Sequence, residues 1–338
     1  MNRLEYLKLA SEIHSRVKNL TQTNIEKNKH QTIFDLRIFI HKSIIEELNL
    51  LTNITSKGLA FPIGINGDPI VAHYTTMKIS NNFKAHLPYY LNPDTPINNF
   101  NILKIDYGIH ICGNIIDKAF SINIHNTPLE ELLIEASFSA VEHIKKEIGI
   151  DARLNELAKG AREIVESYEH NNSHLKIVEN VYSHNILPWK IHGEKFIKPD
   201  FFYYEEDLKV KSGEQYAIEI YASDGEGKGI LVENPSVHSH YRLKEMDIYQ
   251  LTHDDECNQM LSYIKDKRNY LPFCPNMCNL KIGKKKLSHS KISSLCQKLQ
   301  SLNFVESYPP IIEKDYNSKV SQIEENIIIL DNETKVVL

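Results

Sequence analysis

The chain lacks both a long apolar segment and an excess of positive charge. No uninterrupted apolar run approaches the roughly 20 residues needed to cross a bilayer. Charges interrupt residues 1–20 every few positions, which excludes the apolar core of a signal peptide. The net charge of −5 argues against nucleic acid as the main partner. These absences predict a cytoplasmic protein that has neither a membrane nor DNA as a partner.

Cysteine is also scarce, with five in 338 residues. An odd number in a chain of this size does not favour a disulfide framework. Cys274 and Cys278 are close in sequence, but no second Cys/His pair with zinc-like spacing accompanies them, so packed or surface thiols are favoured over a zinc site. The length fits one large α/β domain or two smaller ones.

Hydrophobic periodicity predicts four helices outside residues 241–307. The stretch 33–51 is apolar on more than one side and predicts a well-buried helix. Thr127-Pro128-Leu129-Glu130 has the pattern of a capping box with proline at the first helical position, so a helix should run from there to about residue 148. A further helix fits residues 153–169. The first helix is predicted from an apolar stripe formed by Leu4, Leu7, Ala10, Ile13, Val17 and Leu20.

The remaining segments predict strands, turns and one insertion. Residues 58–76 are rich in glycine and proline, and residues 83–100 are polar and predict a surface loop. Residues 241–307 carry helical stripes and predict a helical insertion. Its Lys284-Lys285-Lys286 run is favoured as a solvated face, with docking on a ribosome as the alternative. Further strands are predicted near residues 176–187, 214–222 and 229–233 and in the late segment QIEENIIIL.

Residues 101–124 predict a β-hairpin that carries two carboxylates. Asp106 alternates with apolar residues in the first strand, and Asp117 lies in the second. Gly108 and Gly113 are predicted to bracket the turn. Carboxylates on adjacent paired strands can converge on one face of a sheet.

Charged side chains inside apolar strands form the main functional signal. An unpaired charge is costly to bury, and few lysines or arginines lie near these carboxylates in the sequence. Together with one histidine they make a hard, oxygen-rich ligand set, which suits a pair of divalent cations that activates water for hydrolysis. The candidate metal ligands are Asp106, Asp117, His184, Glu219 and Glu324.

Seven sequence frames, in order from about residue 57 to residue 332, resemble those of the type 2 methionine aminopeptidases. They are AFPIGINGDPIVAHYT, KIDYGIHICGNIIDKAF, SHNILPWKIHG, QYAIEIYASDGEGKG, SHYRL, YPP and QIEENIII. The resemblance implies an α/β (α+β) pita-bread fold, shared with creatinase, aminopeptidase P and prolidase, with the helical insertion typical of type 2 enzymes. It also implies N-terminal helices over residues 1–56, a catalytic domain over 57–240 plus 308–338, and an insertion subdomain over 241–307.

The resemblance also implies roles for individual residues. Asp117 and Glu324 would bridge two ions, with Asp106 on one ion and His184 and Glu219 on the other. His73 and His192 would contact the substrate and, with Glu219, act in catalysis, and His73 would be the residue that fumagillin-type inhibitors modify. The methionine pocket would be lined by Phe61, Ile191, His240 and Tyr308.

The activity implied is removal of the N-terminal methionine from nascent proteins with two divalent ions, Co, Mn, Fe or Zn. Oxygen-rich ligation with a single histidine favours Mn²⁺, Fe²⁺ or Co²⁺ over a structural, thiolate-bound Zn²⁺. The alternative is a catalytically impaired pita-bread protein that binds RNA or other proteins, although such relatives typically lose ligands. A prolidase-like peptidase is disfavoured by the AHYT frame and by the insertion ending in YPP.

Three positions depart from the family pattern. Ser183-His184-Asn185-Ile186-Leu187 replaces a glycine-rich frame around the ligand histidine, which predicts a reshaped pocket wall. Ile220 stands where threonine is usual, and Glu325 where histidine is usual. Because groups around ligands orient them and tune metal affinity, often by about 10–100-fold, these departures bear on the catalytic rate more than on the fold or on metal binding.

Overall fold

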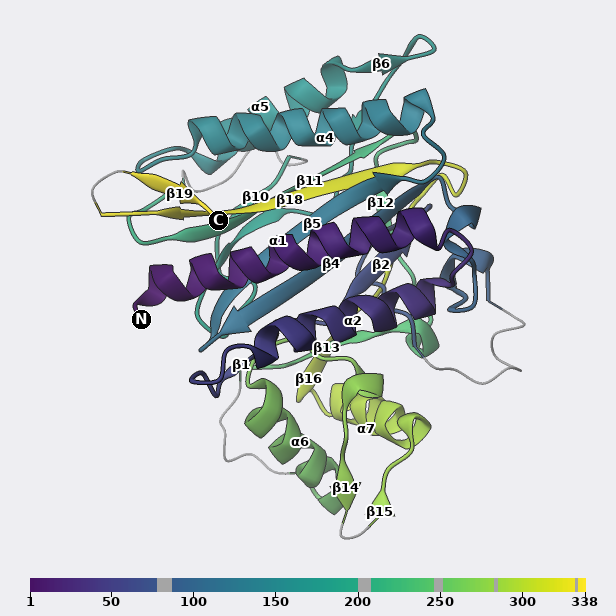
Figure 1. Cartoon of the computed structure of the whole chain (residues 1–338), viewed down its shortest axis with the longest axis vertical. Helices are drawn as coiled ribbons and strands as arrows, with labels where there is room; N and C mark the ends of the chain where they lie inside the picture. Colours follow the sequence, from purple (N-terminus) through teal and green to yellow (C-terminus); the bar gives the residue numbers. More distant parts are fainter. Residues whose placement is uncertain (78–86, 200–207, 246–251, 283–284, 332–333) are drawn as a thin grey trace.

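A ten-stranded sheet forms the centre of the computed structural model (Figure 1), which describes residues 1–77, 87–199, 208–245, 252–282, 285–331 and 334–338. Its main path runs β1-β4-β5-β18-β11-β9-β10, and its strand pairs are antiparallel. The path strands are β1 (Lys57–Leu59), β4 (Ile102–Ile111), β5 (Asn114–Asn123), β9 (Ser183–Ile186), β10 (Phe196–Ile197), β11 (Gln215–Ser223) and β18 (Val320–Ile329). β2 (Gly64–Gly67), β8 (Lys176–Ile177) and β19 (Lys335–Val337) pair beside this path.

Four helices cover one face of this sheet (Figure 1). They are α1 (Arg3–Lys27), α2 (Ile33–Asn49), α4 (Pro128–Glu147) and α5 (Leu154–Ser167). α1 packs on β4 and β5, where Tyr107 is buried in the same cluster as Ile13. α4 packs on β11 and β18, where Ile218 and Ile220 are buried with Leu133. Since neighbouring strand residues point to opposite faces, the residues between these apolar ones face away from the helices.

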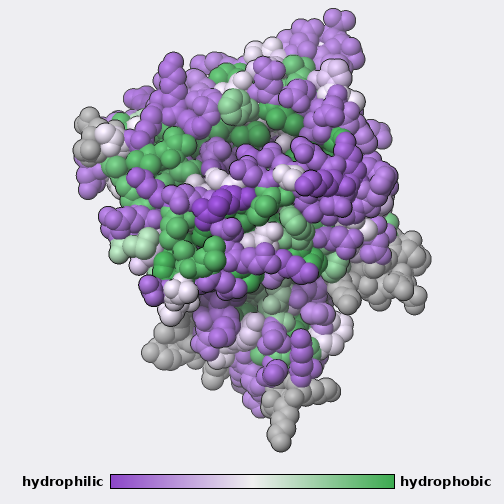
Figure 2. Space-filling view, in the orientation of Figure 1, coloured by the Kyte–Doolittle hydropathy of each residue, from purple (hydrophilic) through white to green (hydrophobic). Residues whose placement is uncertain are grey.

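The predicted stripe of α1 is correct except at Leu20, and Leu4 is partly buried against the core. Leu7, Ala10, Ile13 and Val17 are fully buried, but Leu20 is 47% exposed and the helix continues to Lys27. The exposed leucine belongs to a helix-covered face on which apolar and hydrophilic side chains are interspersed (Figure 2). The buried side of α1 continues through Thr21 and Ile25, so Leu20 lies beside it and not beyond its end.

Two predicted local features are wrong. Thr127 is the N-cap of α4 and Pro128 its first residue, but no capping box forms: the Thr127 hydroxyl donates to the Glu130 carboxylate and accepts no backbone hydrogen bond. Gly108 does not flank the hairpin turn. It lies inside β4 opposite Asp117, and the turn is formed by Cys112 and Gly113.

The predicted surface loop lies partly outside the described residues. From residue 87 onward it contains two short 3₁₀ helices, Tyr89–Leu91 and Ile97–Asn99. Leu91, Ile97 and Phe100 are buried, so this part of the segment packs against the core rather than lying on the surface.

The insertion is bounded by paired strands β13 (His240–Leu243) and β16 (Val305–Tyr308). Between them α6 (Asp255–Arg268) and α7 (His289–Ser301) bury a separate apolar cluster. All five cysteines are free thiols, as predicted, and Cys112 alone among them is not fully buried. Lys284 lies outside the described residues, and Lys286 is exposed. The division of the chain into domains stays a prediction.

The other described elements are short. The strands β3 (Ile70–Ala72), β12 (Gly229–Leu231) and β17 (Ile311–Glu313) form a three-stranded sheet. Two-residue strands form the hairpins β6–β7 (Glu169–His170, Ser173–His174) and β14–β15 (Lys281–Ile282, Lys285–Lys286). Two 3₁₀ helices cover Pro235–Val237 and Pro275–Met277. No helix of the described residues is long and apolar enough to span a bilayer.

His14 makes stability depend on pH. Its ring is buried and stacks on Tyr107 at 4.1 Å, and its Nε2 donates to the Lys118 carbonyl at 3.1 Å. Burial lowers the pKa of His14 well below its usual value, so below about pH 6.5 the unfolded chain binds a proton that the folded chain does not. As the pH falls from 6.5 to 5, the unfolding free energy of the parent should therefore decrease because of His14, by up to about 1.4 kcal/mol per pH unit. We expect this contribution to be absent in His14→Phe. Urea unfolding across this range measures the slope, and an unchanged slope would contradict the assignment.

Candidate metal centre

The acidic residues form a row across the face of the sheet opposite the helices. Asp106 on β4 is paired with Ala119 on β5, and Ala119 is paired with Glu324 on β18. Glu324 is in turn directly opposite Glu219 on β11. Asp117 lies two residues from Ala119, so it points to the same face. Antiparallel pairing therefore brings together carboxylates that are far apart in the sequence.

His184 completes the cluster from β9. It is paired with Ala217, two residues from Glu219 on β11, and so faces the same side. Its Nε2 lies 3.6 Å from Asp117 Oδ2 and 3.9 Å from Glu219 Oε1. Asp117, His184 and Glu324 each offer a ligand atom within 4.8 Å of the others. This is a spacing at which one cation could contact all three.

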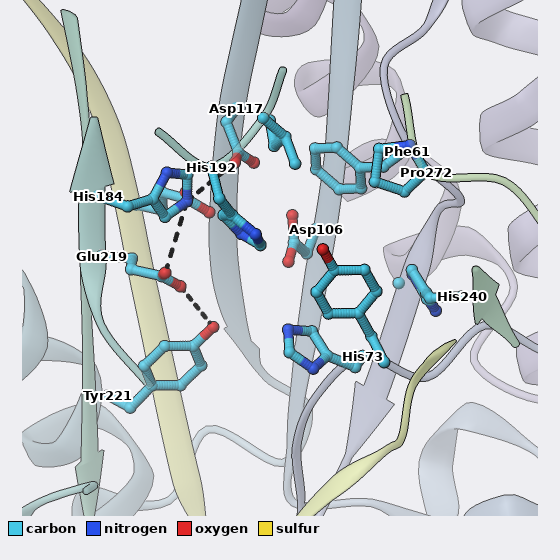
Figure 3. A pocket seen from close by; sticks show the side chains of 14 residues that line it. Phe61, His73, Asp106, Asp117, His184, His192, Glu219, Tyr221, His240 and Pro272 are labelled. Carbon is cyan, nitrogen blue, oxygen red and sulfur yellow. Dashed lines mark hydrogen bonds and ion pairs between the residues drawn. The ribbon is translucent and has the colours of Figure 1, made fainter. Parts of the chain in front are cut away.

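The structure places every predicted site residue on one cavity (Figure 3). His73 and His192 project into it from opposite sides and both lie against Tyr308, at ring-centroid distances of 5.6 and 5.7 Å. Their assignment as ligands or catalytic groups stays a prediction. The predicted residues on the lining are Phe61, His73, Asp106, Asp117, His184, Ile191, His192, Glu219, His240, Tyr308 and Glu324.

The carboxylates of this cluster are costly to ionise together. Burial raises the pKa of Asp106 to about 7. Burial and the charge of Asp106 raise the pKa of Glu219 to about 8. Burial and the neighbouring carboxylates raise those of Asp117 and Glu324 well above their usual values. Asp106 Oδ1 is buried and has no hydrogen-bond partner among the described residues. Four carboxylates match the charge of two divalent cations, so the ligand set fits a metal pair.

The histidines of the cavity are neutral near pH 7. Burial lowers the pKa of His73 and of His184 to about 4 and that of His240 to about 3. The pKa of His192 is lowered well below its usual value by burial and by its neighbours His184 and His73. A neutral imidazole offers one N–H donor and one lone pair, which suits both metal ligation and hydrogen bonding to substrate.

The apolar wall of the cavity is tied to the insertion. Arg268, at the end of α6, donates to the carbonyls of Leu59 and Ala60 at 2.9 and 3.1 Å and to that of Pro272 at 2.5 Å. Ala60 precedes the pocket residue Phe61, and Pro272 itself lines the cavity. Burial lowers the pKa of Arg268 to about 10, so its guanidinium stays charged near pH 7 while it holds these segments together.

Four residues in or beside the site were not singled out from the sequence. Tyr221, Gly64 and Pro272 line the cavity. Asn326 fixes the backbone of Asp117: its Oδ1 accepts from the Asp117 N–H at 3.1 Å, and its Nδ2 donates to the Asp117 carbonyl. The sequence did hold a signal for the role of Gly108, because a glycine inside a strand often marks a place where another group approaches the backbone closely. A Cβ at Gly108 would lie 2.3 Å from the Phe61 ring.

Two of the three departures from the family pattern lie away from the site, contrary to our prediction. Ile220 is buried against the helices, and Glu325 forms an ion pair with Lys118 at 2.5 Å on that same face, so neither touches the cavity. Ser183 does support the site, because its hydroxyl bonds to both the N–H and the carbonyl of Glu219 at 2.9 Å. Trp189 packs against the hairpin turn, and its backbone N–H donates to the Gly113 carbonyl at 2.9 Å.

Comparison with known proteins agrees with the cluster's chemistry. The family model described as "Metallopeptidase family M24" matches residues 5–238. The chain belongs to metallopeptidase family M24. Methionine aminopeptidase 2 of Sclerotinia sclerotiorum is 31% identical over 347 residues, covering 99% of this chain and 70% of the relative. The corresponding protein of Botryotinia fuckeliana shows the same identity and coverage. The resemblance to type 2 methionine aminopeptidases is thus confirmed.

Solved structures of this M24 protein's relatives share its fold. A thermophilic Arx1 has a TM-score of 0.78 at 17% identity, covering 97% of this chain and 88% of the other. Methionine aminopeptidase from Thermotoga maritima has a TM-score of 0.59 at 13% identity, covering 99% and 95%. The predicted α/β pita-bread fold is confirmed, while at such low identity these structures carry no conclusion about activity.

Proposed function

We propose that this M24 protein removes N-terminal methionine from polypeptides by metal-dependent amide hydrolysis. The order of the ligand strands carries the proposal. Asp117 on β5 and Glu324 on β18 occupy the middle of the row, with Asp106 on one side and Glu219 with His184 on the other. A carboxylate in the middle of such a row is suited to bridging, because each of its two oxygens can face a different ion.

The ligand roles follow from this order. Asp106 would hold one divalent cation, His184 and Glu219 the other, and Asp117 and Glu324 both. Such a pair supplies a water of lowered pKa and polarises the scissile carbonyl. Mn²⁺, Fe²⁺ and Co²⁺ suit four carboxylates and one imidazole.

The histidines would act on the substrate itself. His73 and His192 stay neutral, so each can donate an N–H to the developing oxyanion or to the leaving nitrogen. His192 lies against His184 at a ring-centroid distance of 4.3 Å, which places it beside the ligand cluster. We also propose that His73 is the residue that fumagillin-type inhibitors modify.

The pocket wall suits a methionine side chain. Phe61, Ile191, Pro272 and Tyr308 give the cavity an apolar and aromatic lining close to the carboxylates. A thioether gains from contacts with aromatic rings and tolerates an irregular pocket because it is unbranched. Action on nascent chains in the cytoplasm and contact with a ribosome stay predictions.

A binding module without catalysis is the second candidate. Arx1, whose name is not that of a peptidase, shares the fold with a TM-score of 0.78, so the fold alone does not decide between catalysis and binding. Against the binding module stands the complete ligand set on one cavity, since a protein selected only for binding has no need to bury four carboxylates together.

Methionine release tests the proposal. The purified protein should release methionine from Met-Ala-Ser with Mn²⁺ or Co²⁺ and lose this activity when a chelator removes the ions. Asp117→Ala serves as the inactive control. Release of the first residue from an X-Pro peptide in place of methionine would assign the protein to another peptidase activity. No release from either peptide would favour the binding module.

A further inference from the structure

Tyr221 donates a hydrogen bond to a carboxylate of the metal cluster. Its hydroxyl lies 2.7 Å from Glu219 Oε2, whereas the other oxygen, Oε1, faces His184 Nε2 at 3.9 Å (Figure 3). The two oxygens of Glu219 therefore have different environments. One accepts the hydrogen bond from Tyr221, and the other lies beside His184.

A second contact fixes the direction of this hydrogen bond. Gln322 Nε2 donates to the Tyr221 oxygen at 2.8 Å and to Asp106 Oδ2 at 3.4 Å. An Asp106 carboxylate requires a donor, so the amide nitrogen of Gln322, and not its oxygen, must lie on this side. Because the Tyr221 oxygen accepts from Gln322, its own proton is directed to Glu219.

We propose that Tyr221 is a positioning residue, which holds Glu219 Oε2 so that Oε1 is presented beside His184 as a cation ligand. This inference rests on the proposed metal-dependent function. Gln322 extends the same network to Asp106 and so connects the two ends of the carboxylate row. The Tyr221 hydroxyl lies on the face of β11 that lines the cavity. The adjacent Ile220 lies on the helix face and cannot have this role.

The ring and the hydroxyl of Tyr221 can be tested separately. The ring packs among Val178, Val181 and Val320, which the phenyl ring of a Phe would also contact. Tyr221→Phe therefore removes only the hydroxyl. On the same strand, Tyr216 is also buried and donates to a carboxylate, Glu214 at 2.7 Å, but it lies on the helix face. Tyr216→Phe is thus the matched control.

Calorimetric titration of the metal-free full-length protein with Mn²⁺ measures the effect directly. We expect Tyr221→Phe to bind its weakest-held ion about 10–100-fold less tightly than the parent, and Tyr216→Phe to bind as the parent does. The visible absorption spectrum of the Co²⁺-loaded protein should change in Tyr221→Phe alone. Methionine release by Tyr221→Phe should recover as Mn²⁺ is raised. Because a bound ion also stabilises the folded state, the unfolding free energy of the metal-free variant should match that of the parent, which excludes a defect in folding.

The outcomes separate this inference from the proposed function. If the parent releases methionine and Tyr221→Phe binds Mn²⁺ as tightly as the parent, the positioning role is wrong and the proposed function stands. Equal weakening in both variants would also overturn it, since any lost tyrosine hydroxyl would then suffice. If the parent neither binds Mn²⁺ nor releases methionine, both proposals are wrong.

Discussion

Glu324→Gln is expected to lower methionine release at least about a thousandfold, because metal-ion catalysis supplies several kcal/mol of transition-state stabilisation. The substitution keeps the shape of the side chain and removes the charge. Glu324 is buried in the middle of the carboxylate row, where it is within reach of both proposed ion positions. Calorimetric titration should show fewer than two bound Mn²⁺ ions per chain, and stopped assays with Met-Ala-Ser should give the rate.

Glu325→Gln is the matched control, one residue further along β18. Glu325 points to the helix face and pairs with Lys118, so both ion stoichiometry and rate should stay close to those of the parent. If Glu324→Gln retained full activity, Glu324 would not be a bridging ligand. A loss of ions from Glu325→Gln would show that the two faces of the sheet are not independent.

Lys104→Met is expected to destabilise the protein by about 3–5 kcal/mol, since it leaves a buried carboxylate without its cation. Lys104 Nζ is fully buried, lies 3.5 Å from Asp68 Oδ1 and donates to the Val320 carbonyl at 2.8 Å. Burial lowers the pKa of Lys104 and raises that of Asp68, so each charge depends on the other for its stability. The free energy of unfolding in urea measures the loss.

The same substitution at an exposed ion pair is the comparison. Lys291 pairs with Glu256 at 2.6 Å, with 44% and 42% of the two side chains exposed. Exposed pairs contribute about 0–1 kcal/mol, so Lys291→Met should change stability only slightly. Equal effects of the two substitutions would mean that the Lys104 pair is not specially dependent on burial.

The fold and the ligand cluster could be predicted because their sequence signals are local. Asp106, Asp117, Glu219 and Glu324 each sit within an apolar strand, where a charge needs a partner. The frames around them identified the family, and the family supplied the strand order that composition and periodicity do not contain. The sequence alone did not give the pairing of Glu219 with Glu324, which depends on long-range register.

The supporting residues were harder to predict. Tyr221 lies two residues after Glu219 and so shares its face of β11, but a buried tyrosine is usually a core residue, and the sequence does not show that its hydroxyl would meet the carboxylate. The error on Ile220 and Glu325 was avoidable, because each follows a predicted ligand in a strand and must point to the opposite face. The Thr127 hydroxyl donates to Glu130 without accepting from the backbone, whereas in α2 the Thr32 hydroxyl donates to Asp35 and also accepts from its N–H.

The insertion also has a consequence for selectivity. His240 and Tyr308 are direct partners across the two strands at its base, and Arg268 joins its first helix to the backbone beside Phe61. Substitutions in the core between α6 and α7 can thus shift the walls of the proposed methionine pocket and leave the proposed ligands on the central sheet in place. Variation in this peripheral part of the chain offers a route by which related proteins could change which amino terminus they accept while keeping the same hydrolytic chemistry.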